Sequence, residues 1–351
     1  MTVTEPGPLA GLRVIEIGHS VAAPFCARLL ADLGTDVIKV EPLDGDPVRQ
    51  WGIQAGGPAS SKAPRDAVQY PTICCDLEAT VPHFSANLTL LFNELPFLDR
   101  FKAAAAAGFK AVEFYFPYEY RSADLRRLLR DNGLRLVVHS LPGGDWAKGE
   151  RGVACLPDRI DEFREGVARG IDYARALECP RLTCLAGIRP PALPLDEAFR
   201  VLMDNLRFAA EQLAEAGLEL VVEQVNSRDV PGFLLDRPEA ALAVVREIGA
   251  RNLKLQYDVY HAQVLAGDLT RFVETNVDHI GHIQIADNPG RHEPGTGEIN
   301  YDFFLRRIGE IGYSGWVGCE YIPLSTTTAG LDWLRRINTS MNTAALFGVH
   351  K

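Results

Sequence analysis

Residues 181–225, RLTCLAGIRPPALPLDEAFRVLMDNLRFAAEQLAEAGLELVVEQV, contain two short apolar segments. A longer stretch in which polar and apolar residues are mixed separates them. The two segments, Arg181–Gly187 and Glu219–Val225, have the length and composition of buried strands. Between them, Leu195–Ala216 carries apolar residues at the spacing of a helix. A strand followed by a helix and a second strand predicts a β-α-β unit with parallel strands.

The same alternation extends in both directions from this unit. Apolar segments that predict strands are His83–Thr89, Ala111–Pro117, Arg135–Leu141, Arg181–Gly187, Glu219–Val225, Leu253–Val259, Ile280–Ala286 and Gly315–Tyr321. The intervening predicted helices include Phe97–Ala107, Ser122–Asn132, Asp161–Leu177, Leu195–Ala216 and Pro238–Gly249. Eight strand–helix units over about 250 residues predict an α/β fold, the (β/α)8 TIM barrel. The alternative is a doubly wound open sheet, but no G-x-G-x-x-G turn follows the first strand.

A separate β-α-β unit precedes the barrel. Its predicted strands are residues 12–18 and 36–41, with a helix over residues 22–33 between them. One such unit is too small to bury both faces of its strands alone. Residues 53–80 then lose periodicity and have loop composition. The predicted organisation is an N-terminal β-α-β fragment (1–52), a linker (53–80), the barrel (81–335) and a C-terminal tail (336–351).

The formal net charge of −10 argues against two classes of partner. A surface of this sign repels phosphate backbones and anionic lipid, so we expect neither nucleic acid nor membrane as a partner. A small anionic substrate stays possible, because a local cation reverses the field inside a pocket. The seven cysteines show neither zinc-ribbon nor CxxC spacing. No secretory signal is evident at the N-terminus, so we expect a reducing cytoplasm.

Polar residues near the ends of four successive predicted strands point to a metal site. In a parallel barrel the functional groups lie at the C-terminal strand ends. Carboxylates that meet there repel one another unless a cation offsets their charge. Oxygen ligands suit Mg²⁺ best, with Mn²⁺ as a second option. The predicted ligands are Glu223, Asp258, Gln284 and Glu320.

Other polar residues are weaker candidates for substrate binding. His139 ends the third strand, and His261 follows Asp258 by one turn. Arg291 and Lys148 lie in loops where they could meet a substrate carboxylate. Glu113 lies within the second strand and could orient a ligand or a loop. For each of these residues the alternative is a structural role, such as capping a helix or bonding to backbone.

Several longer motifs resemble those of the hydroxypyruvate isomerases. These enzymes belong to the xylose-isomerase-like barrel superfamily, and the resemblance spans about residues 82–334. The motifs are FSANL (84–88), HSLPGGDW (139–146), QYDVYH (256–261), HIQIADNP (282–289), EPGTGEINY (293–301) and WVGCEY (316–321). The sequence departs from that family at Gln224, where a proline is usual, and in its first eighty residues.

This resemblance implies an intramolecular oxidoreductase that interconverts hydroxypyruvate and 2-hydroxy-3-oxopropanoate (tartronate semialdehyde). It also implies that Glu223 and Glu320 are the proton donor and acceptor, with the reaction passing through a metal-bound enediolate. A hydride shift is the alternative route. The related 2-oxo-tetronate isomerases share the metal residues, so the alternative function is that of an isomerase or epimerase of a related 2-keto sugar acid or ketose. Such an enzyme acts on a small hydroxy-keto acid and is a possible homo-oligomer.

Residues 8–52 resemble the opening of the family III CoA-transferases. The sequence that carries the catalytic aspartate in that family is absent from this chain, so the resemblance implies no transferase activity. Two other classes are possible in principle: a catalytically silent fusion, or a multi-zinc phosphodiesterase similar to endonuclease IV. The latter needs a histidine-rich site and a basic face, and the chain has eight histidines and a net charge of −10.

Overall fold

The computed structural model divides the chain into two units, residues 1–78 and 79–351. The residues that it describes are 9, 11–16, 26–27, 29–31, 33, 35–41, 73–74 and 82–337. Each unit has a sheet of its own.

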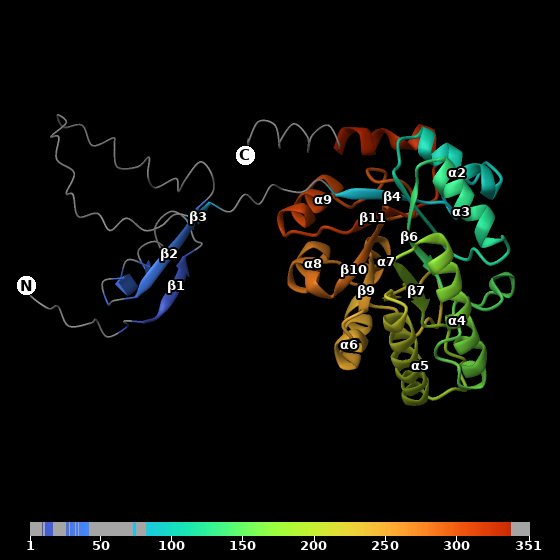
Figure 1. Cartoon of the computed structure of the whole chain (residues 1–351), viewed down its shortest axis with the longest axis horizontal. Helices are drawn as coiled ribbons and strands as arrows, with labels where there is room; N and C mark the ends of the chain where they lie inside the picture. The colour runs from blue at the N-terminus through green and yellow to red at the C-terminus, as the bar shows by residue number, and fades with distance from the viewer. Residues whose placement is uncertain are drawn as a thin grey trace, which may run out of the picture. The chain divides into compact units, whose positions relative to one another are not determined.

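Within residues 82–337, eight parallel strands close into a barrel that is surrounded by helices (Figure 1). The strands are β4 (His83–Asn87), β5 (Ala111–Phe114), β6 (Arg135–Ser140), β7 (Arg181–Leu185), β8 (Glu219–Glu223), β9 (Leu253–Asp258), β10 (Ile280–Ile285) and β11 (Trp316–Cys319). Each strand pairs with its neighbour in sequence, and β11 pairs with β4 to close the ring. The prediction of a (β/α)8 barrel is therefore confirmed.

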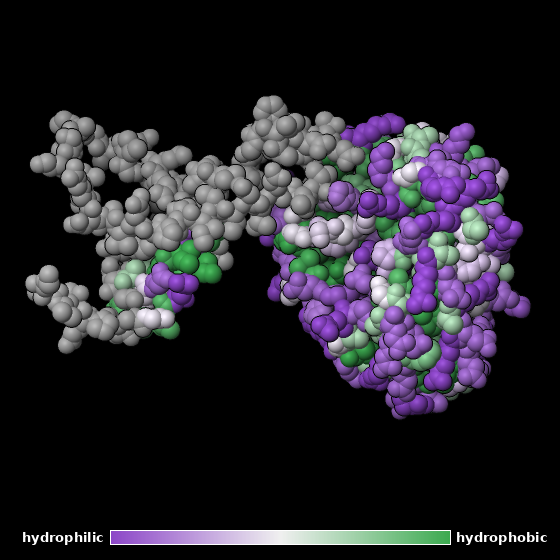
Figure 2. All heavy atoms as spheres, in the orientation of Figure 1, coloured by the Kyte–Doolittle hydropathy of each residue, from purple (hydrophilic) through white to green (hydrophobic). Residues whose placement is uncertain are grey.

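The helices pack an apolar face against the strands. They are α2 (Phe97–Ala106), α3 (Ser122–Asp131), α4 (Ile160–Leu177), α5 (Leu195–Glu215), α6 (Pro238–Ile248), α7 (Val259–Leu265), α8 (Leu269–Asn276) and α9 (Tyr301–Glu310). In α3, for example, Leu125 and Leu129 are buried at a spacing of one turn while the arginines between them face solvent. The barrel unit accordingly presents a mostly hydrophilic surface in the view of Figure 2.

The interior of the barrel changes from apolar to polar along the strands. Ala111, Val137 and Val221 form an apolar cluster inside it. Because alternate residues of a strand point to the same side, Glu113 and Glu223 follow Ala111 and Val221 on the inner face. Both glutamates are buried. Polar groups thus lie inside the barrel toward the C-terminal ends of its strands.

The N-terminal unit contains a parallel sheet in the order β1 (Arg13–Glu16), β2 (Asp36–Glu41) and β3 (Ile73–Cys74). The strand β3 lies in the segment predicted as a linker. The predicted helix over residues 22–33 is helical at 26–27 and 29–31, and its other residues lie outside the described part, apart from a turn at residue 33. Most of the predicted C-terminal tail, residues 338–351, also lies outside it. In the described part of the chain, no helix combines the length and apolarity needed to span a membrane.

Candidate active site

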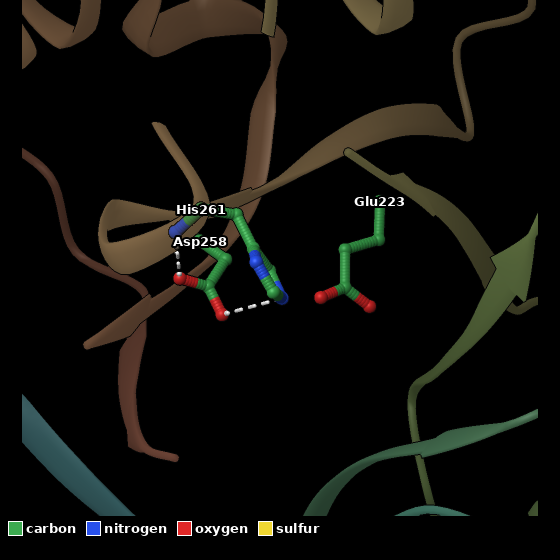
Figure 3. Close-up of side chains that lie close together, drawn as sticks. All are labelled: Glu223, Asp258 and His261. Atoms are coloured by element: carbon green, nitrogen blue, oxygen red, sulfur yellow. Dashed lines mark hydrogen bonds and ion pairs between the residues drawn. The ribbon is translucent and has the colours of Figure 1, made fainter. Parts of the chain in front are cut away.

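Three carboxylates meet at the C-terminal rim of the barrel. Glu223 and Asp258 are the last residues of β8 and β9, and Glu320 directly follows β11. All three are buried. Ligand atoms of Glu223, Asp258 and His261 lie within 4.8 Å of one another. In Figure 3 the His261 ring lies between the carboxylates of Asp258 and Glu223.

Four side chains donate hydrogen bonds to the Glu320 carboxylate. The Asn87 Nδ2 atom lies 2.9 Å from its Oε2 atom, and the Tyr115 hydroxyl lies 2.6 Å from Oε1. The Arg291 Nη2 atom lies 2.5 Å from Oε1, and the Gln284 Nε2 atom donates to Oε2. These four bonds hold the Glu320 carboxyl group in one orientation.

The loop between β10 and α9 places Arg291 among these carboxylates. Asp287 orders the loop, because its carboxylate accepts bonds from the backbone N–H groups of Gly295 (2.8 Å) and Ile299 (3.1 Å). The Arg291 carbonyl accepts a bond from the Ile322 N–H at 2.7 Å, which joins this loop to the one after β11. The Arg291 Nη2 atom lies 3.7 Å from Asp258 Oδ2.

The rim has more negative charge than its one arginine offsets. Burial and the neighbouring charges of Glu320 and Asp258 raise the pKa of Glu223 well above its ordinary value. Burial, opposed in part by Arg291, raises the pKa of Asp258 to about 6 and that of Glu320 to about 8. Without further positive charge, Glu320 therefore holds a proton at neutral pH, whereas Asp258 is mostly ionised there.

This donor set fits a divalent metal ion. Asp258 Oδ2 is buried and accepts no hydrogen bond from any residue that the structure describes, so it is free to act as a ligand. Carboxylate oxygens are the ligands that Mg²⁺ and Mn²⁺ prefer. A divalent charge would also offset the repulsion that raises the pKa of Glu223.

Gln284 reaches the rim with its amide nitrogen rather than its oxygen. Its Nε2 atom donates to Glu320 and, at 2.8 Å, to Glu113. Its Oε1 atom accepts a bond from Gln256 Nε2 at 2.6 Å. The predicted role of Gln284 as an oxygen ligand therefore requires its amide to turn over, together with that of Gln256.

Glu113 lies inside the barrel, separated from Glu320 by the amides of Asn87 and Gln284. Its carboxylate accepts bonds from Ser85 Oγ (2.8 Å), Asn87 Nδ2 (3.2 Å) and Gln284 Nε2 (2.8 Å), and His282 Nε2 lies 2.8 Å away. Burial opposes ionisation, but the charge and hydrogen bond of His282 outweigh it and lower the pKa of Glu113. Glu113 therefore supports Asn87 and Gln284, the two amides that also donate to Glu320.

His261 joins the rim from the first turn of α7. Its backbone N–H donates to Asp258 Oδ1 at 3.0 Å, which caps the helix, and its ring Nε2 lies 3.8 Å from Asp258 Oδ2. Burial lowers the pKa of His261 well below its ordinary value, so the ring is neutral.

The structure does not bring His139 and Lys148 into this cluster. His139 is buried between Phe114 and Tyr118, and its Nδ1 atom lies 3.2 Å from the Ser140 carbonyl. Burial lowers the pKa of His139 to about 4. The Lys148 side chain is 81% exposed and forms an ion pair with Asp145 at 2.8 Å.

Two residues of the site were not predicted from the sequence. Asn87 ends β4 and contacts both Glu113 and Glu320. A polar residue at the end of an apolar strand was the signal available for it. Tyr115 follows β5 in a stretch rich in aromatic residues, and its hydroxyl donates to Glu320. No signal in the sequence separates this tyrosine from its aromatic neighbours.

Comparison with known proteins agrees with this geometry. Residues 101–337 match the model of the xylose isomerase-like TIM barrel family. The chain belongs to this family. It is 50% identical to the hydroxypyruvate isomerase of Escherichia coli (strain K12) over 72% of this chain and 97% of that protein. It is 45% identical to a 2-oxo-tetronate isomerase of Cupriavidus necator over 73% and 98%.

A solved structure from Brucella melitensis shares the same barrel. It is titled AP endonuclease, family 2, and is 42% identical to this chain with a TM-score of 0.71, covering 73% of this chain and 98% of that one. Residues 9–66 match the model of CoA-transferase family III. The relatives and the barrel identify an isomerase of a keto acid, preceded by a fragment of CoA-transferase type.

Proposed function

We propose that the barrel interconverts hydroxypyruvate and 2-hydroxy-3-oxopropanoate. The observation that supports this most strongly is the pair Glu223 and Glu320, two buried carboxylates of raised pKa on one rim. Raising the pKa of a carboxyl group from its ordinary value makes it a better proton acceptor and still lets it return the proton. The 50% identity to the Escherichia coli enzyme supports the choice of substrate.

Glu223, Asp258 and Glu320 would hold a divalent ion, with Mg²⁺ as the expected species and Gln284 as a fourth ligand once its amide has turned. When bound, the ion would polarise the carbonyl and hydroxyl oxygens of the substrate and acidify the adjacent C–H bond. The Nε–H of Arg291, which has no hydrogen-bond partner among the described residues, is available to contact the substrate's oxygens. So is His261 Nε2, which lies 3.8 Å from Asp258 Oδ2.

In the proposed reaction one glutamate removes a proton from C3 of hydroxypyruvate, which leaves an enediolate. The other glutamate delivers a proton to C2, and the hydroxyl proton moves from the C3 oxygen to the C2 oxygen. No other atom is gained or lost, so the product is the aldehyde isomer. Glu223 and Glu320 come from different strands, so each can reach a different carbon of a flat intermediate.

A coupled assay tests this proposal. Hydroxypyruvate is supplied with Mg²⁺, and tartronate semialdehyde is detected through a specific reductase. We expect product formation that EDTA abolishes and added Mg²⁺ restores. Solvent deuterium in the product would support proton transfer, whereas its absence would support a hydride shift. A full-length, folded protein that forms no product with either Mg²⁺ or Mn²⁺ would contradict the assignment.

The second candidate substrate is a 2-oxo-tetronate, supported by the 45% identity to the Cupriavidus necator enzyme. Comparing kcat/KM for the two substrates decides between them. Our proposal requires that the ratio favour hydroxypyruvate. A ratio that favours the four-carbon substrate by about tenfold or more, which corresponds to about 1.4 kcal/mol, would replace it.

A further inference from the structure

The orientation of the Asn226 side chain is fixed by four neighbours. Its Oδ1 atom accepts bonds from the backbone N–H groups of Arg228 (3.1 Å) and Asp229 (2.9 Å). Its Nδ2 atom donates to Asp229 Oδ2 at 3.0 Å and lies 2.7 Å from His261 Nδ1. Asn226 is fully buried. Turning the amide over would lose three of these bonds, so the nitrogen must face His261.

The amide nitrogen of Asn226 can only donate. The His261 Nδ1 atom at 2.7 Å must therefore accept, which leaves it without a proton. In a neutral imidazole the proton then resides on Nε2. Nε2 is the ring atom that faces Asp258 Oδ2 across 3.8 Å. His261 thus presents an N–H group, not a lone pair, to the centre of the rim.

We infer that Asn226, oriented by its two backbone bonds, is a positioning residue that holds His261 as a hydrogen-bond donor to a substrate oxygen rather than as a metal ligand. The spacing of Glu223, Asp258 and His261 would by itself allow all three to bind one ion. A nitrogen that carries a proton has no lone pair for a metal, so the ion would be left to the carboxylates. The assignment of the acceptor as a substrate oxygen rests on the proposed function.

Reversing the polarity of this hydrogen-bond chain is the sharpest test. In the double variant Asn226→Asp/Asp229→Asn, the carboxylate introduced at position 226 keeps both backbone bonds and accepts a bond from the amide introduced at position 229. It therefore faces His261 Nδ1 with an oxygen, and Nδ1 must then carry the proton. Total charge and shape are unchanged, and the Tyr260 hydroxyl, now 2.8 Å from Asp229 Oδ2, can turn to accept. Asp229→Asn alone leaves Asn226 bonded to backbone and is the matched control.

The proton is located by two-bond ¹H–¹⁵N spectra of the full-length protein with ¹⁵N-labelled histidine, the His261 signals being those lost in His261→Gln. We expect the proton on Nε2 in the wild type and in Asp229→Asn, and on Nδ1 in the double variant. A wild-type proton on Nδ1 would overturn the inference. This measurement does not depend on activity, so it tests the inference independently of the proposed function.

Metal binding and kinetics test the two roles. Mn²⁺ titration should show His261→Gln within about 100-fold of the wild-type Kd, the range expected for a residue that only contacts a ligand, whereas a larger loss would identify His261 as a ligand itself. On hydroxypyruvate the double variant should lose about 10²-fold in kcat, as much as His261→Gln, while Asp229→Asn stays near wild type. A double variant with reversed tautomer and wild-type kcat would remove His261 from the reaction as a donor.

Discussion

Glu113 and Glu320 are buried carboxylates of the same barrel with opposite behaviour. Each accepts hydrogen bonds from several side chains, and both accept from Asn87 and Gln284. Yet the pKa of Glu113 is lowered, whereas that of Glu320 is raised to about 8. Hydrogen bonding is thus similar for the two groups, and the surrounding charge decides which of them ionises.

Glu113 faces a histidine, and Glu320 faces other carboxylates that Arg291 offsets only in part. The inner carboxylate is therefore a structural anion, held by hydrogen bonds from Ser85, Asn87 and Gln284 and by its contact with His282. The rim is short of positive charge, which is the condition that a divalent cation relieves. A mutation at the inner position should thus affect stability, and one at the rim should affect catalysis.

The largest expected effect is that of Glu320→Gln on turnover. An amide cannot exchange a proton, so kcat on hydroxypyruvate should fall by about 10³-fold or more. Glu223→Gln should lower kcat by a similar factor, for the same reason. Circular dichroism should show the wild-type fold. Wild-type rates in either variant would remove that glutamate from the mechanism.

Glu113→Gln should show the opposite pattern, with a loss of stability. The variant leaves His282 without its anionic partner and places an amide nitrogen among donors. Leaving a buried partner of a carboxylate without its hydrogen bond costs about 1–3 kcal/mol or more, measured as the free energy of unfolding in urea. If Glu113→Gln unfolds at the same urea concentration as the wild type, the interpretation of Glu113 as a stabilising structural anion is wrong.

Gly318 on β11 packs against the Glu113 carboxylate, so a substitution there gives a second test of the structural role of Glu113. A Cβ atom at this position would lie 2.4 Å from both carboxylate oxygens of Glu113, so Gly318→Ala must displace that group. We expect a loss of about 1–3 kcal/mol in unfolding free energy. Gly166→Ala in α4 is the control, because its Cβ would meet Pro142 at an ordinary 3.4 Å. That change should be neutral or stabilise by up to about 1 kcal/mol.

The smallest effect concerns the pH dependence of metal binding. In the metal-free protein, Asp258 and Glu320 hold protons below pKa values of about 6 and 8, and a cation must displace those protons. Affinity for Mn²⁺ should therefore rise between pH 6 and pH 8, by about tenfold per unit for each proton released. Titration calorimetry in buffers of different ionisation enthalpy measures the release. Affinity that is constant over this range would show that the rim is already ionised.

The alternation of strands and helices was sufficient to predict the barrel and the strand ends that carry Glu223 and Asp258. Such positions could be predicted because carboxylates end several strands of one barrel, and the C-terminal strand ends are where functional groups lie. The polar residues inside the barrel could not be predicted in the same way, because residues in the middle of a barrel strand are normally apolar. Glu113, Gln256 and His282 are exceptions, and all three are buried. Their hydrogen bonds join strands far apart in sequence.

The directions in which side chains point could not be predicted from the sequence either. Loop composition suggested anion contacts for both Arg291 and Lys148, but only Arg291 turns inward, where the Ile322 N–H holds its backbone. Lys148 pairs locally with Asp145. Which atom of the Gln284 amide faces the rim depends on Gln256 and Glu113, two residues on other strands.

The most direct test of the rim as a metal centre is the anomalous scattering of Mn²⁺ in crystals of the protein. We predict one strong peak within about 2.5 Å of oxygen atoms from Glu223, Asp258 and Glu320 together, with the His261 ring outside that distance. A peak bound by Glu223, Asp258 and the His261 nitrogen without Glu320, or no peak at the rim at saturating Mn²⁺, would contradict the account.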